Sequence, residues 1–116
     1  RWARCLAPFR HRECEILEVG CWEGGSTVFF ANFIPKSLVV CVDSFRGGQD
    51  QLDDPATKQL VQDVEGHFDY NVAEFGSRIE KCVGDSAMCL SRLKSEGRNF
   101  DVVYIDASHR RDDVLI

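Results

Sequence analysis

Residues Glu18 to Thr27 (EVGCWEGGST) constrain the fold of this chain more than any other stretch. They follow the apolar pair at 16–17, so an apolar strand, a glycine loop and a helix start come in direct succession. Glycine lets such a loop turn sharply and approach a ligand closely, because no Cβ is in the way. Ser26 or Thr27 is expected to cap the helix that follows. The pattern predicts a ligand site at the end of the first strand.

The glycine spacing argues against a phosphate ligand. The stretch from Gly20 to Thr27 nearly matches the GxxxxGK[ST] phosphate loop, but Ser26 stands where the lysine is needed. The GxGxxG dinucleotide fingerprint also fails, which disfavours an NAD-dependent dehydrogenase. Two acids of the loop, Glu18 and Glu23, would repel a phosphate. These residues favour a nucleoside-sized ligand without phosphate and suit one with a cationic part.

Short apolar runs alternate with longer amphipathic runs along the chain, as in a parallel sheet covered by helices. Strands are expected at residues 15–19, 37–43, 79–83 and 100–105, and helices at 26–34, 56–75 and 87–93, with a further helix from His109. A glycine pair at 47–48 predicts a loop over 45–55, with a lid or plain disorder as the two alternatives. We expect one domain over residues 1–116, in which 1–13 is a polar lead-in.

The composition excludes several partner classes. With 14 basic and 19 acidic residues the net charge is −5, so neither nucleic acid nor an anionic membrane is expected to bind. No apolar stretch reaches the length of a membrane span. The chain has 6 cysteines, of which Cys41 and Cys82 lie in apolar runs. Without a visible signal peptide or a CxxC pair, we expect reduced thiols, no zinc and a cytoplasmic location.

Four elements in this order and spacing resemble the class I S-adenosylmethionine-dependent methyltransferases. They are the loop at 18–27, Val42-Asp43-Ser44, residues 83–86 (VGDS) and residues 103–106 (VYID). The closest likeness is to the small-molecule O-methyltransferase branch, in which a motif E-x-G-x-x-x-G-x-S opens the cofactor site. The resemblance covers about residues 13 to 116. It implies S-adenosylmethionine as cofactor and transfer of a methyl group to a hydroxyl of a small molecule or sugar, although it does not identify the acceptor.

The resemblance also implies an α/β fold. We expect a Rossmann-like, three-layer parallel sheet with helices on both faces and strand order 3-2-1-4. The family's domain has seven strands, so the chain is expected to be truncated: either a fragment or a half-domain completed by other chains. The open edge of the fourth strand is expected to recruit a second copy. The alternative function is a non-catalytic nucleoside-binding or cofactor-binding module, or an inactive methyltransferase fragment.

Acids at strand ends are the first candidates for cofactor contacts. The resemblance implies that Asp43 accepts both ribose hydroxyls; the alternative is a turn or cap aspartate. Asp85 would receive the adenine amino group and Ser86 would bond a ring nitrogen, but the pair is equally suited to cap a helix. Ser44 follows Asp43 and is included in the expected site.

The glycine loop supplies the other cofactor residues. Glu18 stands where the family keeps an acid near the methionine ammonium or the loop amides, and its alternative role is to hold the loop backbone. Trp22 either flanks the cofactor or covers the loop. Phe45 packs either on the adenine face or in the core. Gly20, Gly24 and Ser26 complete the expected cofactor site.

The segment Asp106-Ala-Ser-His109 is the candidate catalytic site. In metal-dependent members of that branch, an aspartate at this strand end binds the divalent cation and a lysine three residues later is the base. Here the third residue is His109, which can act as a general base near neutral pH. The resemblance thus assigns Asp106 to catalysis and to Mg²⁺, although the other ligands would come from a fifth strand. The alternative is that Asp106 and Ser108 cap a helix and His109 faces solvent.

Overall fold

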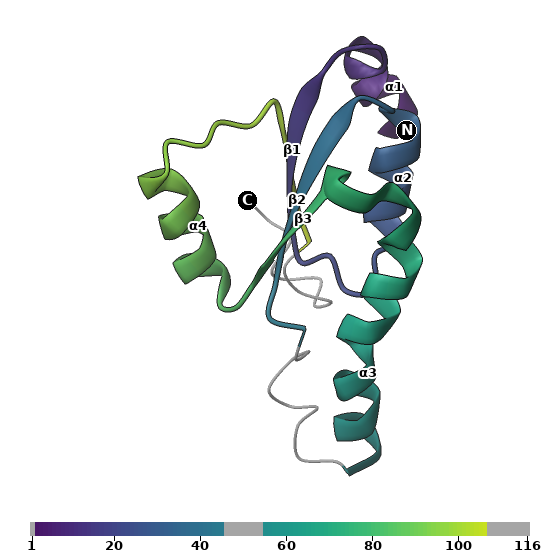
Figure 1. Ribbon diagram of the computed structural model, residues 1–116, viewed down its shortest axis with the longest axis vertical. Helices are drawn as coiled ribbons and strands as arrows, with labels where there is room; N and C mark the ends of the chain where they lie inside the picture. The colour runs from purple at the N-terminus through teal and green to yellow at the C-terminus, as the bar shows by residue number, and fades with distance from the viewer. Residues whose placement is uncertain (1, 46–54, 107–116) are drawn as a thin grey trace.

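The sheet has four parallel strands in the order β3-β2-β1-β4, as expected (Figure 1). In this computed structural model the described residues are 2–45 and 55–106, with side chains described for 4–45 and 64–106. The strands are β1 (Cys14–Val19), β2 (Ser37–Asp43), β3 (Ile79–Val83) and β4 (Val102–Ile105). β1 pairs with β2 from Cys14↔Ser37 to Val19↔Val42. The parallel register brings the carboxyl ends of all strands to the same edge of the sheet.

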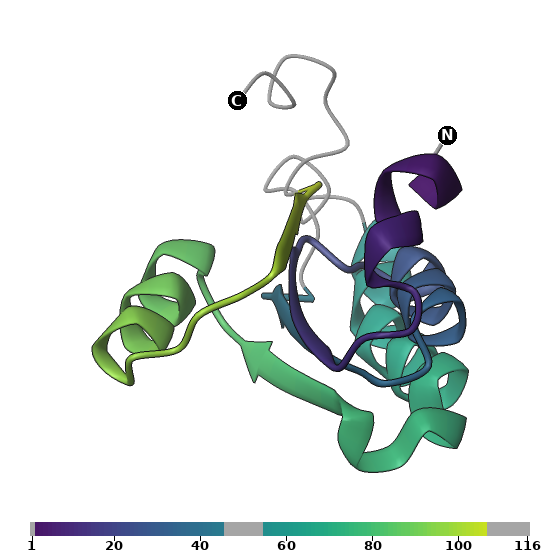
Figure 2. The same cartoon turned by 90° about the horizontal axis from the view of Figure 1, so that it is seen from above.

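Helices cover both faces of the sheet, which gives three layers (Figure 2). The short helix α1 (Trp2–Leu6), α2 (Gly25–Phe33) and the long α3 (Pro55–Val72) lie on one face. The helix α4 (Ser86–Ser95) lies on the other. Two 3₁₀ segments, Ala7–Phe9 and Ala73–Arg78, follow α1 and α3. This is the Rossmann-like arrangement that the sequence predicts.

Each face of the sheet has its own apolar core. The side chains of Ile16, Val39 and Cys41 pack with Phe30 and Phe68 from α2 and α3. The opposite side chains of the same strands pack with α4, and this second cluster contains Leu17, Val19, Val40, Val42, Cys82, Cys89 and Leu93. The middle of β2 is therefore buried on both sides, as its nearly continuous apolar sequence predicts.

Element boundaries differ from the expected ones mainly at the helices. α3 ends at Val72, and the backbone continues as a 3₁₀ segment in which Gly76 has φ of 56°. β4 begins at Val102, because the preceding Asp101 turns to bind Glu15: its carboxylate accepts the Glu15 N–H at 2.9 Å and its own N–H donates to the Glu15 carbonyl at 2.8 Å. The predicted loop tip at 47–48 and the helix from His109 lie outside the described residues.

Arg78, the last residue of the 3₁₀ segment before β3, binds the end of α2. Its guanidinium donates to the carbonyls of Ala31 at 2.7 Å, Ile34 at 3.2 Å and Ser37 at 3.1 Å. The last carbonyls of a helix have no partner within the helix, so the guanidinium satisfies the Ala31 carbonyl near the end of α2 while it also binds the turn that leads into β2. This contact fixes α2 relative to the sheet.

All 6 cysteines are free thiols, as expected. Burial raises the pKa of Cys89 to about 11, and its thiol lies 3.5 Å from the Cys82 carbonyl. Across residues 2–45 and 55–106, none of the helices has both the length and the apolar character needed to cross a membrane.

Candidate functional site

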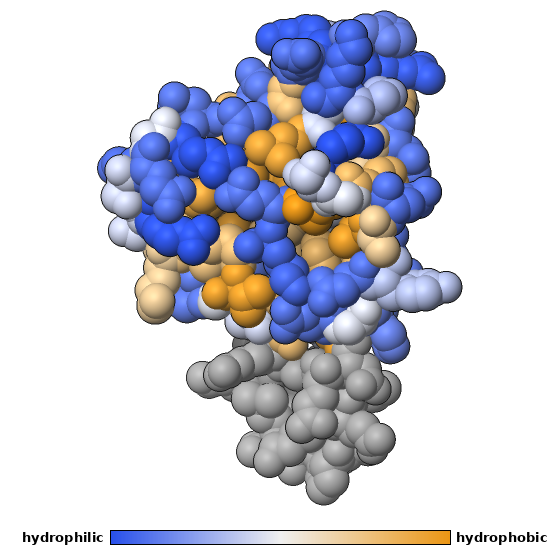
Figure 3. Space-filling model, viewed as in Figure 1, coloured by the Kyte–Doolittle hydropathy of each residue, from blue (hydrophilic) through white to orange (hydrophobic). Residues whose placement is uncertain are grey.

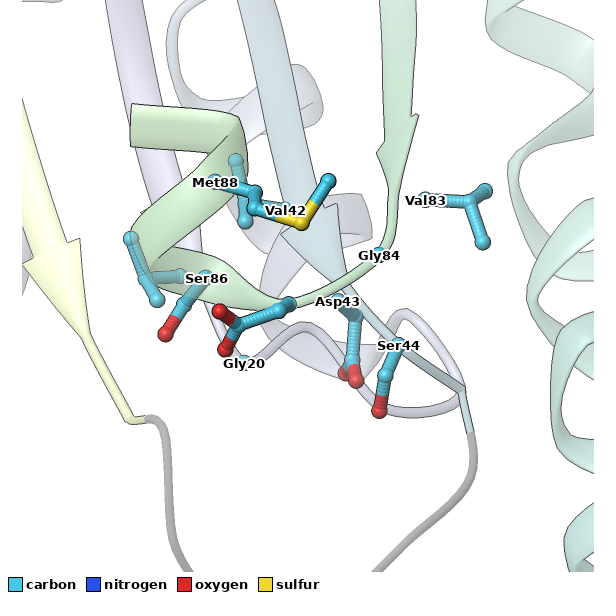
Figure 4. A pocket seen from close by; sticks show the side chains of 10 residues that line it. Gly20, Val42, Asp43, Ser44, Val83, Gly84, Ser86 and Met88 are labelled. Atoms are coloured by element: carbon cyan, nitrogen blue, oxygen red, sulfur yellow. The ribbon is translucent and has the colours of Figure 1, made fainter. Parts of the chain in front are cut away.

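A cavity of about 580 Å³ lies at the carboxyl ends of β1, β2 and β3 (Figure 4). It collects Asp43, Ser44, Asp85 and Ser86, all of which the sequence predicts as site residues, together with Gly20 of the glycine loop. In Figure 4 the polar tips of Asp43, Ser44 and Ser86 point to the same open side, beyond the strand ends. The volume is in the range of ordinary small-molecule sites.

The glycine loop between β1 and α2 depends on an unusual backbone. Gly20 has φ of 84° and donates its N–H to the Val42 carbonyl at 2.8 Å, which holds the start of the loop against β2. Trp22 has φ of 51°, an uncommon conformation for a residue with a side chain. Gly24 has φ of 92°, and a Cβ there would come within 3.1 Å of Phe68. The glycine at 24 is therefore required both by conformation and by space.

Asp43 connects the loop to the end of β2. One carboxylate oxygen accepts the Trp22 N–H at 2.8 Å, and the other accepts the Phe45 N–H at 2.9 Å. Asp43 also lines the cavity and is partly exposed there. Each carboxylate oxygen has more than one lone pair, so the group can accept further hydrogen bonds from a ligand on its open side.

Glu18 is completely buried beneath the loop. Its two carboxylate oxygens accept hydrogen bonds from the hydroxyls of Ser26 and Thr27. Burial raises the pKa of Glu18; the two hydroxyl hydrogen bonds oppose this shift, and the charges of Asp106 and Asp43 add to it. These contacts favour the role of holding the loop. They also correct the capping prediction, because the N-cap of α2 is Gly24 and the two hydroxyls point to Glu18 instead.

Asp85 and Ser86 begin α4 next to the cavity. Asp85 takes the N-cap position, but its side chain makes no capping hydrogen bond. Both residues line the cavity. This arrangement favours a ligand contact over the helix-capping alternative for Asp85.

A second cavity of about 380 Å³ is lined mostly by the glycine loop and shares Gly20 with the first. Trp22, Ser26 and Asp106 line it, so the structure brings these predicted site residues together. Asp106 is held there by its N–H, which donates to the Val19 carbonyl at 2.8 Å. His109 lies outside the described residues, so its role as base stays a prediction.

Phe45 lies in the core and not on the cavity wall. It is 4% exposed, its ring centroid is 5.2 Å from that of Phe68, and the ammonium of Lys81 lies 5.5 Å from the ring centroid. Of the two roles that the sequence leaves open for Phe45, these contacts favour core packing.

Sequence reasoning did not identify the apolar wall of the first cavity. Val83 and Met88 line it and are 51% and 71% exposed, an unusual exposure for large apolar side chains. Figure 3 shows apolar surface near the turn between β3 and α4. The position of Met88, three residues after Asp85 on the first turn of a helix, is the signal that could have found it.

A Mg²⁺ site is not assembled by the described part of the chain. Among the side chains that the structure describes, at 4–45 and 64–106, no three of His, Cys, Asp or Glu are grouped so that they could hold a metal ion. The Mg²⁺ role of Asp106 stays a prediction, and no chemical step is derived through a metal.

Comparison with known proteins agrees with this geometry. A search of curated proteins found no match. The family described as "Methyltransferase domain" matches residues 17–116, which include the carboxyl end of β1, the strands β2 to β4 and the described lining of both cavities. The chain therefore belongs to this methyltransferase-domain family, one of the class I S-adenosylmethionine-dependent methyltransferases.

Proposed function

We propose that this protein binds S-adenosylmethionine and transfers its methyl group to a hydroxyl of a small molecule or sugar. The observation that carries the proposal is the grouping of Asp43, Asp85 and Ser86 around one cavity beside the glycine loop. Ligands of open α/β sheets bind outside the carboxyl ends of the strands, near the point where the strand order reverses. That point lies between β1 and β4, beside the loop.

The first cavity suits the adenosine half of the cofactor. Asp43 accepts hydrogen bonds from the ribose hydroxyls, Asp85 accepts one from the adenine amino group, and Ser86 bonds a ring nitrogen. Met88 and Val83 offer apolar surface to the base. The carboxylate acceptors Asp43 and Asp85 on the lining favour a nucleoside over a phosphorylated nucleotide.

The second cavity suits the methionine half and the acceptor. When bound, the cofactor supplies an electrophilic methyl group on a cationic sulfonium. Asp106 and the buried Glu18 place negative charge near that cation and the amino group of the methionine. His109, which lies outside the described residues, would take the hydroxyl proton that methyl transfer to the acceptor oxygen releases. Trp22 limits the cavity on the side of the loop.

We also propose a homo-oligomer and a cytoplasmic location. β4 is the outermost strand of the sheet beside β1, and its side chains Val103 and Ile105 are 55% and 38% exposed, which supports a homo-oligomer formed through this strand. The free thiols favour a reducing compartment such as the cytoplasm.

Isothermal titration with S-adenosylhomocysteine, and separately with NAD, tests the proposal, with light scattering to give the oligomeric state. Binding of S-adenosylhomocysteine alone supports the cofactor assignment, and methylation of a hydroxyl compound from an acceptor panel supports the reaction. Binding without turnover on any acceptor would favour the non-catalytic module. A folded sample that binds NAD and not S-adenosylhomocysteine would refute the proposal.

A further inference from the structure

Two polar side chains of α3 reach across to the glycine loop and meet it at one residue, Glu23. Asn71 donates its side-chain N–H to the Glu23 carbonyl at 2.9 Å. His67, one turn earlier on the same helix, places Nδ1 2.6 Å from a carboxylate oxygen of Glu23. Residues four apart lie on the same face of a helix, so both contacts come from one edge of α3.

The apolar side of α3 holds the next loop residue. Phe68 and Val72 are buried, and a Cβ on Gly24 would lie 3.1 Å from Phe68 and 3.3 Å from Val72. Gly24 therefore lies in close contact with the helix, while Glu23 beside it is bonded to the helix edge. Residues 23–24 are fixed to α3 by both polar and apolar contacts.

The opposite side of the loop is bound by β2. The Trp22 N–H donates to Asp43 at 2.8 Å, and Trp22 itself has φ of 51°. A positive φ at a residue with a side chain costs free energy and persists only where the surrounding contacts enforce it. The loop shape that separates the two cavities is thus imposed by α3 on one side and by Asp43 on the other.

We propose that Asn71 and His67 are positioning residues, which act through Glu23 to keep the glycine loop in the shape that accepts the ligand. This inference rests on the proposed function for the identity of the ligand, S-adenosylmethionine. Without these contacts the loop samples other conformations, and the apparent dissociation constant rises as the inverse of the fraction that keeps the competent conformation. Loss of one hydrogen bond of ordinary strength corresponds to an affinity roughly 2- to 12-fold weaker.

The test uses Trp22 as a reporter inside the loop. The chain has 2 tryptophans, Trp2 and Trp22, so the variant Trp2→Phe leaves Trp22 as the reporter. In this background Asn71→Leu removes the donor, keeps a similar shape and improves helix propensity. We expect stronger acrylamide quenching of Trp22 in the ligand-free protein, weaker S-adenosylhomocysteine binding by titration, and no decrease in the thermal midpoint.

Tyr70→Ala is the matched control, because Tyr70 precedes Asn71 on the same helix and is 83% exposed. His67→Gln is the second variant; its effect should be smaller, since the His67 and Glu23 side chains are 57% and 44% exposed. Because Asn71 also lines the second cavity, a loss of affinity alone would indicate a direct contact with the ligand, and quenching in Asn71→Leu equal to that of the control would overturn the proposal. If the parent protein fails to bind S-adenosylhomocysteine, the proposed function fails, while the ligand-free quenching still decides whether α3 positions the loop.

Discussion

The carboxylate of Asp43 and the backbone N–H of Trp22 are joined by a 2.8 Å hydrogen bond between positions that lie 21 residues apart in the sequence. The acid that ends β2 is therefore part of the glycine loop that follows β1. The other carboxylate oxygen of Asp43 accepts a hydrogen bond from the Phe45 N–H at 2.9 Å, so both oxygens hold the Asp43 side chain in place. The proposed ribose contact and the local structure of the site therefore involve the same carboxylate.

Asp43→Ala should weaken binding of S-adenosylhomocysteine by about 1 to 3 kcal/mol, the range for losing hydrogen bonds to a charged group. Isothermal titration measures this change. Asp101→Ala is the matched control, because Asp101 also accepts a backbone N–H, from Glu15 at 2.9 Å, but lies near the amino end of β1. Equal affinity in the two variants would contradict the ribose assignment of Asp43.

Gly24→Ala and Gly25→Ala should change stability in opposite directions. Alanine at 24 combines a φ of 92° with a close approach to Phe68, so we expect a loss of about 1 to 3 kcal/mol in the free energy of unfolding. Alanine at 25, the first residue of α2, meets nothing within 4 Å, so we expect no loss and a gain of up to about 1 kcal/mol from helix propensity. Urea unfolding measures both, and equal effects would show that the loop backbone is not constrained as described.

Glu18→Gln should change how stability depends on pH. Burial raises the pKa of Glu18 in the folded protein, so the folded state keeps this proton to a higher pH than the unfolded state does. The free energy of unfolding of the parent therefore falls as the pH rises. The fall begins near the pKa of glutamate in the unfolded state, about 4.3, and ends above the higher pKa of the folded state. Between these two pKa values the slope is about 1.4 kcal/mol for each pH unit. The variant lacks this titration. Unfolding curves measured across that pH interval and up to neutral pH should show the parent losing stability relative to Glu18→Gln, and a constant difference between the two would disprove the assignment.

Arg78→Met should destabilise the fold through the end of α2. The variant keeps much of the apolar stem but leaves the carbonyls of Ala31, Ile34 and Ser37 without their guanidinium donor. A loss of about 1.5 to 3 kcal/mol is expected for hydrogen bonds from a charged group. Arg92→Met is the control, because Arg92 is exposed and pairs within its own helix, with Glu96 at 3.4 Å. Similar unfolding free energies for the two variants would argue against the role of Arg78.

The strands could be predicted from sequence because each is a short apolar run that the sheet buries. β2 and β3 have the predicted bounds, and the strand order follows the family resemblance. The helix starts lie within one residue of the expected ones, but the capping prediction for α2 was wrong. Ser26 and Thr27 are good capping residues by type, but their hydroxyls are bound to the buried Glu18, a contact over eight and nine residues that no local rule describes.

The part of the site that lies at the ends of the strands could be predicted, because the strand order alone decides which residues meet there. Parallel strands bring their ends together, so Asp43 and Asp85 meet at one cavity although they are far apart in the sequence. The partners of Glu23 were not predictable, because His67 and Asn71 lie 44 and 48 positions away from it. Their placement depends on how α3 packs over the loop, which leaves no periodic signal in the sequence.

The fixed carboxylate of Asp43 also bears on selectivity. A side chain whose two oxygens are already bonded to backbone amides cannot rotate to follow a poorly matched partner. The entropy of ordering it is lost when the chain folds and not when a ligand arrives, which is the advantage of preorganisation. If Asp43 binds the ribose as proposed, a sugar that lacks one hydroxyl would meet an acceptor that cannot adjust, and the way this strand ends would discriminate against deoxyribose compounds.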